Sequence, residues 1–195
     1  MNLSEGCFFS PFNAEMLNEM NDFDCGNEDL NDFFRNDALN YSNELLGKTY
    51  CFTTGKQANQ IVCCFTVAND AVYLRLLPNN SKKRVRKNIP HSKHNMKYPA
   101  VLIGRIGVNK AFHHQNIGSQ LLDFIKFWFS SKENKTGCRF ITVDAYKSVV
   151  DFYEKNGFNF LYKDEEEEKK QHDISDKKPL RTRIMFFDLG VLRSS

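Results

Sequence analysis

The sequence predicts a single α/β domain over residues 1–195, with a mixed, twisted sheet flanked by helices. With 41% hydrophobic and 26% charged residues, the chain has the composition of a soluble globular protein with one buried core. Two apolar segments on either side of Gly55 are typical of a β-hairpin, and strand-like and helix-like patterns alternate through the second half. This alternation indicates some parallel neighbouring strands, joined by right-handed crossovers.

The first regular element predicted by the sequence is a helix near the start of the chain. Leu30, Phe33, Phe34 and Leu39 recur at helical spacing, and Asn27 before them is a suitable N-cap. Acidic residues in the first turn would also complement the helix dipole.

Strand-like segments follow, interrupted by a region of loop composition. KTYCFTT (48–54) and QIVCCFTVA (60–68) predict the hairpin around Gly55. Residues 78–98 are rich in Pro, Asn and basic side chains and predict a loop, with a short helix as the alternative. The mostly apolar run 99–108 predicts a buried strand, in which two glycines indicate a bulge or a close backbone approach.

From Gly118 the spacing of the apolar residues changes to that of a helix. The segments after it predict, in order, a strand, a short helix that ends at Gly157, another strand, an acidic loop and a last strand. These segments are CRFITVDA (138–145), KSVVDFYEKN (147–156), FNFLY (158–162), the loop with DEEEE (164–168) and TRIMFFDL (182–189).

The composition argues against several kinds of site and location. The six cysteines lack a Cys-x-x-Cys spacing and are expected to be reduced core thiols, and the five histidines form no metal-ligand pattern, so no metal site is expected. No basic leader precedes a long apolar stretch. Neither a secretory signal nor a membrane anchor is therefore indicated, and the cytoplasm is the expected location.

Positive charge is concentrated in one part of the chain, although the net charge is only +3. Residues 71–122 contain ten Lys or Arg and no Asp or Glu. Clustered charge of one sign favours a polyanionic partner, which relieves the repulsion within the cluster. For the segment SKKRVRK (81–87), a solvated surface loop explains the composition equally well.

The segment FHHQNIGSQLL, residues 112–122, has features of a phosphate-binding helix start. The first N–H groups of a helix lack intrahelical partners and point at one place, where the helix dipole adds positive charge. Phosphates bind at such places. Gly118 would allow a close approach and Ser119 would offer a hydroxyl, although a single glycine here is by itself more typical of an ordinary helix entry.

Within this segment, HHQNIG (113–118) resembles the loop that holds the pyrophosphate of coenzyme A in the GNAT superfamily of acyl-CoA-dependent N-acetyltransferases. The family pattern is Gln/Arg-x-x-Gly-x-Gly/Ala, which Gly118 matches and from which His113 and Asn116 depart. Asn tolerates a left-handed backbone better than other residues with a side chain, so the loop conformation is expected to survive. The resemblance implies acetyl-CoA as cofactor, bound by Ile106, Gly107, Val108, His113, His114, Gln115, Asn116, Ile117, Gly118 and Ser119.

A second segment, VDAYKSVVDFYEKNGF (143–158), resembles a strand, helix and ending of the same family. There, a tyrosine at the position of Tyr153 often lies near the cofactor sulfur, which implies that Tyr153 protonates the departing thiolate as a general acid. Without the resemblance, Phe152, Tyr153 and Phe158 are ordinary core aromatics. The family fold has three layers, with about six to seven strands, about four flanking helices and a splayed central strand.

Three further segments, FDCGNEDLNDFFRNDA, LIGRIGV and RTRIMFFDL, resemble a branch of the GNAT family that includes toxins acetylating aminoacyl-tRNA. Such toxins are encoded beside a ribbon-helix-helix antitoxin. The resemblance implies direct acetyl transfer to a primary amine, with the α-amine of aminoacyl-tRNA as one acceptor. The residues expected to contact the RNA phosphates are Lys82, Lys83, Arg84, Arg86, Lys87 and Arg105.

Two other functions remain open at this point. The chain could acetylate a small amine or a protein amino group, with the basic segment merely solvated, or it could be an inactive GNAT domain that binds coenzyme A. The sequence shows no obvious general base. An α-amine with a pKa of about 7.7 to 8.0 is partly neutral near pH 7, so water or a distant carboxylate would be a sufficient base. A monomer or a homodimer without membrane contact is expected.

Overall fold

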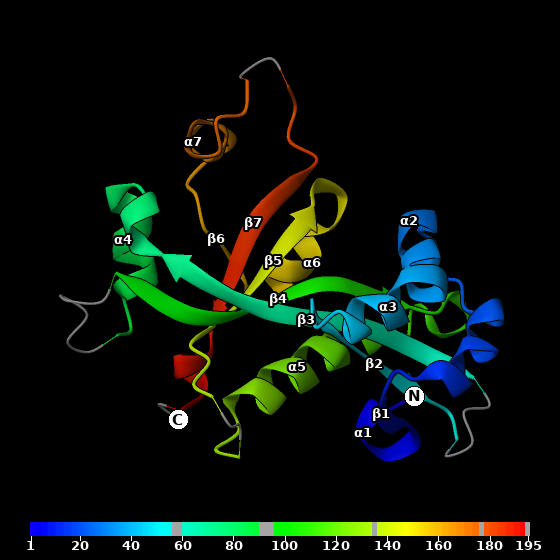
Figure 1. Ribbon diagram of the computed structural model, residues 1–195. Helices are drawn as coiled ribbons and strands as arrows, with labels where there is room; N and C mark the ends of the chain where they lie inside the picture. Colours follow the sequence, from blue (N-terminus) through cyan, green and yellow to red (C-terminus); the bar gives the residue numbers. More distant parts are fainter. Residues whose placement is uncertain (56–59, 90–95, 134–135, 176–177, 194–195) are drawn as a thin grey trace. The chain divides into compact units, whose positions relative to one another are not determined.

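A computed structural model describes residues 1–55, 60–89, 96–133, 136–175 and 178–193. Seven strands of the described chain form one sheet in the order β1-β2-β3-β4-β5-β7-β6 (Figure 1). The predicted fold class, a mixed α/β sheet flanked by helices, is confirmed. The strands are β1 (Phe8–Pro11), β2 (Lys48–Thr53), β3 (Ile61–Tyr73), β4 (Lys97–Val108), β5 (Phe140–Tyr146), β6 (Asn159–Phe160) and β7 (Thr182–Asp188).

The helices lie between these strands in the sequence. The α-helices are α1 (Leu3–Gly6), α2 (Glu28–Asp32), α3 (Ala38–Asn43), α4 (Asn79–Arg86), α5 (Ile117–Ser130), α6 (Val150–Lys155) and α7 (Glu165–Gln171). Shorter helical turns are η1 (Ala14–Leu17), η2 (Glu19–Asp22), η4 (Leu74–Leu76), η6 (Lys110–Phe112), η7 (Lys147–Val149) and η8 (Leu189–Arg193), and η3 (Phe33–Asp37) is a π-helix.

The chain divides into two compact units. Unit 1 comprises Met1–Ala68 and Ile103–Ile125, and unit 2 comprises Asn69–Leu102 and Lys126–Ser195. Strands β3 and β4 and helix α5 each contribute residues to both units. The single domain therefore stays a prediction, and each unit is described by itself below.

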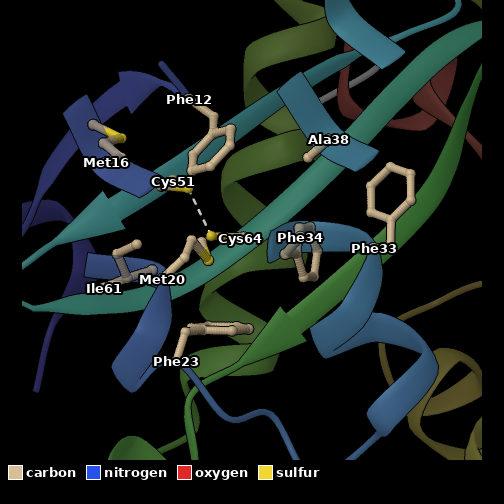
Figure 2. Packing of buried hydrophobic residues seen from close by; sticks show 10 residues of the cluster. All are labelled: Phe12, Met16, Met20, Phe23, Phe33, Phe34, Ala38, Cys51, Ile61 and Cys64. Carbon is tan, nitrogen blue, oxygen red and sulfur yellow. Dashed lines mark hydrogen bonds between the residues drawn. The ribbon is translucent and has the colours of Figure 1, made fainter. Parts of the chain in front are cut away.

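The core of unit 1 is built around the predicted hairpin. Strands β2 and β3 are antiparallel, and Cys51 lies opposite Cys64 with the two Sγ atoms 2.6 Å apart. Figure 2 shows the two sulfurs facing each other, with the side chains of Phe12, Met20 and Phe23 around them. The six cysteines are free thiols; Cys51, Cys63 and Cys64 are buried as predicted, while the other three are only partly buried.

The predicted first helix exists but is not one continuous α-helix. The Asn27 side chain caps α2 as expected, because its Oδ1 accepts a hydrogen bond of 3.2 Å from Leu30 N. The π-helix η3 then separates α2 from α3. Phe33 and Phe34 of η3 are buried together with Ala38 of α3, so tertiary packing holds both neighbouring rings in the core.

The predicted acidic loop contains the helix α7, and the segment 78–98 contains the helix α4, as its alternative prediction of a short helix allowed. In α4, Ser81 and Val85 are buried at a spacing of four residues, which places both on the face that packs inward. In α7, the Asp164 side chain accepts a hydrogen bond from Glu167 N, and the glutamates of the first turn complement the helix dipole. Neither segment has an apolar stripe from which a helix could be predicted. Residues 90–95 of the predicted loop 78–98 lie outside the described residues.

The core of unit 2 lies on one face of β5 and β7, which are antiparallel. Phe140 of β5 and Phe186 of β7 pack there with Val85 of α4. Toward β4, Arg139 N donates to Pro99 O at 2.9 Å, and the Thr142 hydroxyl lies 3.4 Å from Val101 O. Residue numbers rise together in these two contacts, as between parallel strands, in agreement with the predicted parallel neighbours.

Candidate active site

The turn that leaves β4 is fixed by a buried asparagine. The Asn109 backbone N–H donates to Val62 O at 2.9 Å, and its side-chain Nδ2 donates to Ile61 O at 3.1 Å. Its Oδ1 accepts a hydrogen bond from Ala111 N at 3.1 Å. These three bonds tie the end of β4 to β3 and start the turn toward α5. Sequence reasoning missed Asn109, although an asparagine directly after an apolar strand is a turn signal.

The loop before α5 has a left-handed backbone at two positions, His114 with φ 62° and Asn116 with φ 59°. The GNAT pattern has a glycine at the position of Asn116, and a left-handed conformation there is the physical reason for that preference. The expectation that Asn116 would keep this conformation is therefore confirmed. The left-handed backbone at His114 was not anticipated from the sequence.

Backbone N–H groups at the start of α5 are directed at the loop. The first helical turn closes with a hydrogen bond of 3.2 Å from Gln120 N to Asn116 O. The N–H groups of Ile117, Gly118 and Ser119 precede this bond and are the donors that a helix start leaves without intrahelical partners. Ile117 is buried and anchors the turn, while the loop before it is exposed. This arrangement fits a phosphate group, with the helix dipole in support.

Two basic or titratable side chains beside this place, those of His113 and Lys110, are engaged in other contacts. The His113 ring Nε2 lies 2.8 Å from Val108 O, to which it donates, so the ring fastens the loop to the end of β4. The Lys110 ammonium lies 2.8 Å from Asp24 Oδ2, so its charge is paired. The groups that this loop offers to an anion are therefore mainly backbone donors.

Asp24 organises the approach to the loop from the N-terminal side. Its carboxylate accepts hydrogen bonds from Lys110 Nζ, from Asn31 Nδ2 at 2.9 Å and from Gly26 N at 2.8 Å. These bonds, that from Lys110 first, hold the pKa of Asp24 well below its usual value. The Asp24 carbonyl also accepts from Lys110 N at 2.7 Å. Sequence reasoning did not single out Asp24, because its partner is 86 residues away.

The glycine of β4 nearest the loop is required by a close side-chain contact. A Cβ atom added at Gly107 would lie 3.1 Å from Cys25 Cβ and 3.2 Å from the Phe34 ring. The predicted close approach is thus present at Gly107, whereas at Gly104 the nearest atom would be 3.9 Å away. Ile106 and Val108, the other residues expected to contact the cofactor through their backbone, are half-buried on either side.

The first residues of the chain contact the same loop. Gln120 Oε1 accepts from Leu3 N at 2.9 Å, and its Nε2 donates to Met1 O at 3.2 Å. The Gln115 side chain accepts from the Met1 ammonium at 3.4 Å. Gln115 and Gln120 therefore join the segment before β1 to the start of α5, a connection that no local pattern predicts.

In unit 2, Tyr153 is a buried residue of α6. Only 4% of its surface is exposed, and its ring makes edge contacts with Phe152 at 5.3 Å and Phe158 at 5.4 Å between centroids. Burial raises the pKa of Tyr153 well above that of an ordinary tyrosine, so the phenol keeps its proton at neutral pH. Tyr153 therefore packs as a core aromatic residue, as expected without the family resemblance, and these ring contacts hold it in one orientation.

The basic residues expected to contact RNA differ in their surroundings. Lys83 of α4 and Lys87 at its C-cap are exposed, whereas Lys82, Arg84 and Arg86 are half-buried. Arg84 Nη1 donates to Phe160 O, which gives this side chain a structural role.

Arg105 belongs to unit 1 instead. Its guanidinium lies 5.0 Å from the centroid of the Phe33 ring and donates to Gly104 O at 2.7 Å. The six basic residues are therefore divided between the two units.

Among the described residues, no three His, Cys, Asp or Glu side chains come together as metal ligands would. Within the same part of the chain, the helices are all too short or too polar to span a bilayer.

The acetyltransferase (GNAT) domain family model matches residues 59–160, more than half of the chain. The chain belongs to the GNAT acetyltransferases. This membership was predicted from the sequence, and the matched segment contains both the loop before α5 and Tyr153. Acetyl-CoA is the acyl donor of the family, and the backbone donors at the start of α5 fit its diphosphate.

Solved structures show the same GNAT fold. A tyrosine-to-phenylalanine mutant of KacT has a TM-score of 0.72 at 17% identity, covering 97% of this chain and 99% of that one. AtaT complexed with acetyl-methionyl-tRNAfMet has a TM-score of 0.71 at 17% identity, covering 96% and 98%. A mutant AtaT toxin bound to acetyl-CoA and the C-terminus of the antitoxin AtaR has a TM-score of 0.67 at 14% identity, covering 98% and 100%. Such identities establish the fold alone.

Proposed function

We propose that the protein transfers an acetyl group from acetyl-CoA to the α-amine of an aminoacyl-tRNA. The observation that carries the proposal is the loop before α5, where a left-handed Asn116 precedes three backbone donors in a GNAT domain. The similarity of the whole fold to AtaT, a protein solved with acetyl-methionyl-tRNAfMet, supports this acceptor over other amines.

The residues of unit 1 hold the cofactor in this proposal. The N–H groups of Ile117, Gly118 and Ser119 bind the diphosphate, and the backbone of Ile106, Gly107 and Val108 binds the extended part of the molecule and the acyl oxygen. Acetyl-CoA supplies the activated acyl group as a thioester. The absence of a side chain at Gly107 keeps Cys25 and Phe34 packed beneath the strand without displacing its backbone.

Tyr153 of unit 2 acts as the general acid. The amine nitrogen forms a bond to the acetyl carbon as the bond from carbon to sulfur breaks, and the phenol gives its proton to the departing sulfur. The raised pKa of Tyr153 ensures that the proton is present throughout the neutral range. An α-amine with a pKa of about 7.7 to 8.0 is partly neutral near pH 7 and can attack. The proton that its nitrogen then releases returns through water to the Tyr153 phenolate and restores the acid.

Electrostatic contacts to RNA come from the exposed basic residues. Lys83 of α4, Lys87 at its C-cap and Arg105 would lie against phosphates, while Arg84 remains in place to hold α4. Binding of tRNA should weaken steeply as salt rises, because neutralised phosphates release counterions. A small ribbon-helix-helix antitoxin is the partner that would silence such an activity.

Incubation of the purified protein with labelled acetyl-CoA and total charged tRNA tests this function. Label should appear on aminoacyl-tRNA, and deacylated tRNA should remain unlabelled as the matched control. Transfer to a panel of small amines in place of charged tRNA would contradict the proposed acceptor. Binding of coenzyme A without transfer to any amine would contradict the enzymatic function itself.

A further inference from the structure

The thiols of Cys51 and Cys64 face each other across the hairpin of unit 1 (Figure 2). The two residues are register partners on the antiparallel strands β2 and β3, and their Sγ atoms lie 2.6 Å apart. Both side chains are fully buried, and both thiols are free. The candidate active site described above uses neither of them.

The register of the hairpin places these two residues within reach of a covalent bond. Directly opposed residues of antiparallel strands have Cα atoms about 4.5 or 5.5 Å apart, and a disulfide spans Cα separations of about 4.4–6.8 Å. Two residues further along the same face, the hydroxyls of Thr49 and Thr66 lie 2.7 Å apart and fix the register there as well. A disulfide therefore fits this pair without a shift of either strand.

The third buried cysteine, Cys63, lies on the opposite face of the sheet, since side chains alternate along a strand. It is opposite Phe52, whose ring centroid lies 4.9 Å from that of Phe124 in α5. Cys64 instead belongs to the cluster drawn in Figure 2. Only one of the two adjacent cysteines therefore faces Cys51.

A β-bulge lies directly beside the facing thiols. The register shifts between Phe52 and Thr53, so Thr53 is opposite Ile61 and Val62 is the extra residue of β3. The carbonyls of Ile61 and Val62 are the two acceptors that hold Asn109 at the end of β4. A covalent link between β2 and β3 at this point would hold the part of β3 to which the turn before α5 is tied.

We propose that Cys51 and Cys64 form a cross-strand disulfide when the protein is exposed to hydrogen peroxide. One sulfur attacks a peroxide oxygen and becomes a sulfenic acid, and the other oxygen takes up the thiol proton and leaves as water. The second thiol then attacks the sulfenic sulfur, and a second water is released. In total, two thiols lose two electrons and two protons, which reduce one hydrogen peroxide to two waters. This modification is independent of the acetyl acceptor.

Burial slows the first step and favours the second. It raises the pKa of Cys64 well above that of an ordinary thiol, and the thiolate is the form that reacts. The oxidant therefore reaches the pair when the hairpin opens locally, and the facing thiol captures the sulfenic acid once the strands pair again. We expect the link to form slowly, after oxidation of the three partly buried cysteines, Cys7, Cys25 and Cys138.

Peptide mapping of the full chain after treatment with hydrogen peroxide tests the proposal. Remaining thiols are blocked with N-ethylmaleimide, and the protein is digested with trypsin with and without dithiothreitol. Trypsin releases Cys51 on the peptide 49–56, and Cys63 and Cys64 on the peptide 57–75. The two peptides should be joined in the oxidised protein, should separate on reduction, and should come from protein that runs as one chain on a non-reducing gel.

Cys64→Ala and Cys63→Ala are the matched variants, because they remove the same group from adjacent, fully buried positions of β3. The joined peptides should be lost in Cys64→Ala and retained in Cys63→Ala. Cys51→Ala should abolish the link as well. It keeps the test available if thermal melts of the reduced protein show that Cys64→Ala does not fold.

Thermal unfolding provides a second readout. The disulfide closes a short loop in the unfolded chain and should raise the unfolding midpoint by about 5–10 °C, a rise that dithiothreitol reverses. Oxidised Cys63→Ala should show the same rise relative to its reduced form, and Cys64→Ala should show none.

Three results would overturn the proposal. Joined peptides that persist in Cys64→Ala would assign the link to Cys63, and joined peptides found only in dimers on the gel would assign it to two chains. An unlinked Cys51 in protein whose three partly buried cysteines are fully oxidised would show that the facing thiols do not form the bond.

Discussion

The two units carry candidate functional groups of different kinds. In unit 1, the loop before α5 offers backbone N–H groups, and the surrounding side chains of Asn109, His113 and Asp24 serve to hold the backbone in place. In unit 2, the candidate group is a side-chain atom, the phenol oxygen of Tyr153. Coenzyme A binding by unit 1 should therefore be sensitive to bulk added beside the backbone, and acetyl transfer to the loss of a single polar atom in unit 2.

The largest effect is expected when the phenol oxygen of unit 2 is removed. Tyr153→Phe keeps the buried ring and its contacts with Phe152 and Phe158, but it removes the proton donor. We expect kcat for acetyl transfer to fall by about 10²–10⁴-fold, with the affinity for coenzyme A unchanged. Steady-state kinetics and calorimetry measure the two quantities.

Tyr41→Phe is the matched control, because Tyr41 also loses only a hydroxyl while its ring stays packed against Phe33. Equal kcat in wild type and Tyr153→Phe would show that unit 2 supplies no acid through this residue.

An intermediate effect is expected when a methyl group enters the crowded strand of unit 1. Gly107→Ala places a Cβ 3.1 Å from Cys25 and 3.2 Å from Phe34, and overpacking of this kind costs about 1–3 kcal/mol of unfolding free energy. Coenzyme A binding should weaken as well, since the backbone of β4 must shift. Urea denaturation and calorimetry provide the measurements.

Gly104→Ala lies on the same strand and is the control, because its Cβ would meet Thr66 O at an ordinary 3.9 Å. Equal unfolding free energies and equal coenzyme A affinities in the two alanine variants would contradict the destabilising contact predicted at Gly107.

The smallest effect is expected at Asp24, whose ion pair with Lys110 is exposed. The folded-state pKa of Asp24 is lowered, so its contribution to stability is fully present above about pH 4, the ordinary value, and is lost as the pH falls toward the folded-state pKa. The difference in unfolding free energy between wild type and Asp24→Asn should therefore shrink below about pH 4.

Denaturation series at several pH values, with Asp37→Asn as the control, measure this difference. A difference that grows as the pH falls would contradict the role given to Asp24. High salt should also reduce the difference, because exposed pairs are screened.

Local patterns in the sequence were enough to predict most of the elements that form the sheet. The helix α2, the hairpin, β4, α5, β5, α6 and β7 were each signalled by a periodic apolar pattern, a cap or a turn glycine, as at Asn27 and Gly157. The segment of α7 was predicted as a loop, and that of α4 as a loop with a short helix as the alternative. Their helices are stabilised by Val85 in the core and by Glu168, which binds Arg183 at 2.6 Å. Neither contact can be predicted from the spacing of residues near it in the sequence.

The sequence by itself was enough to assign the family, to predict that Asn116 tolerates a left-handed backbone and to select Tyr153 as the candidate acid. Each of these depends on residue type within a short stretch of chain. Only the tertiary structure decided that Lys110 is paired with Asp24 and that His113 holds the end of β4. These are contacts between residues far apart in the chain, and their existence depends on the packing of the whole fold, which no local spacing records.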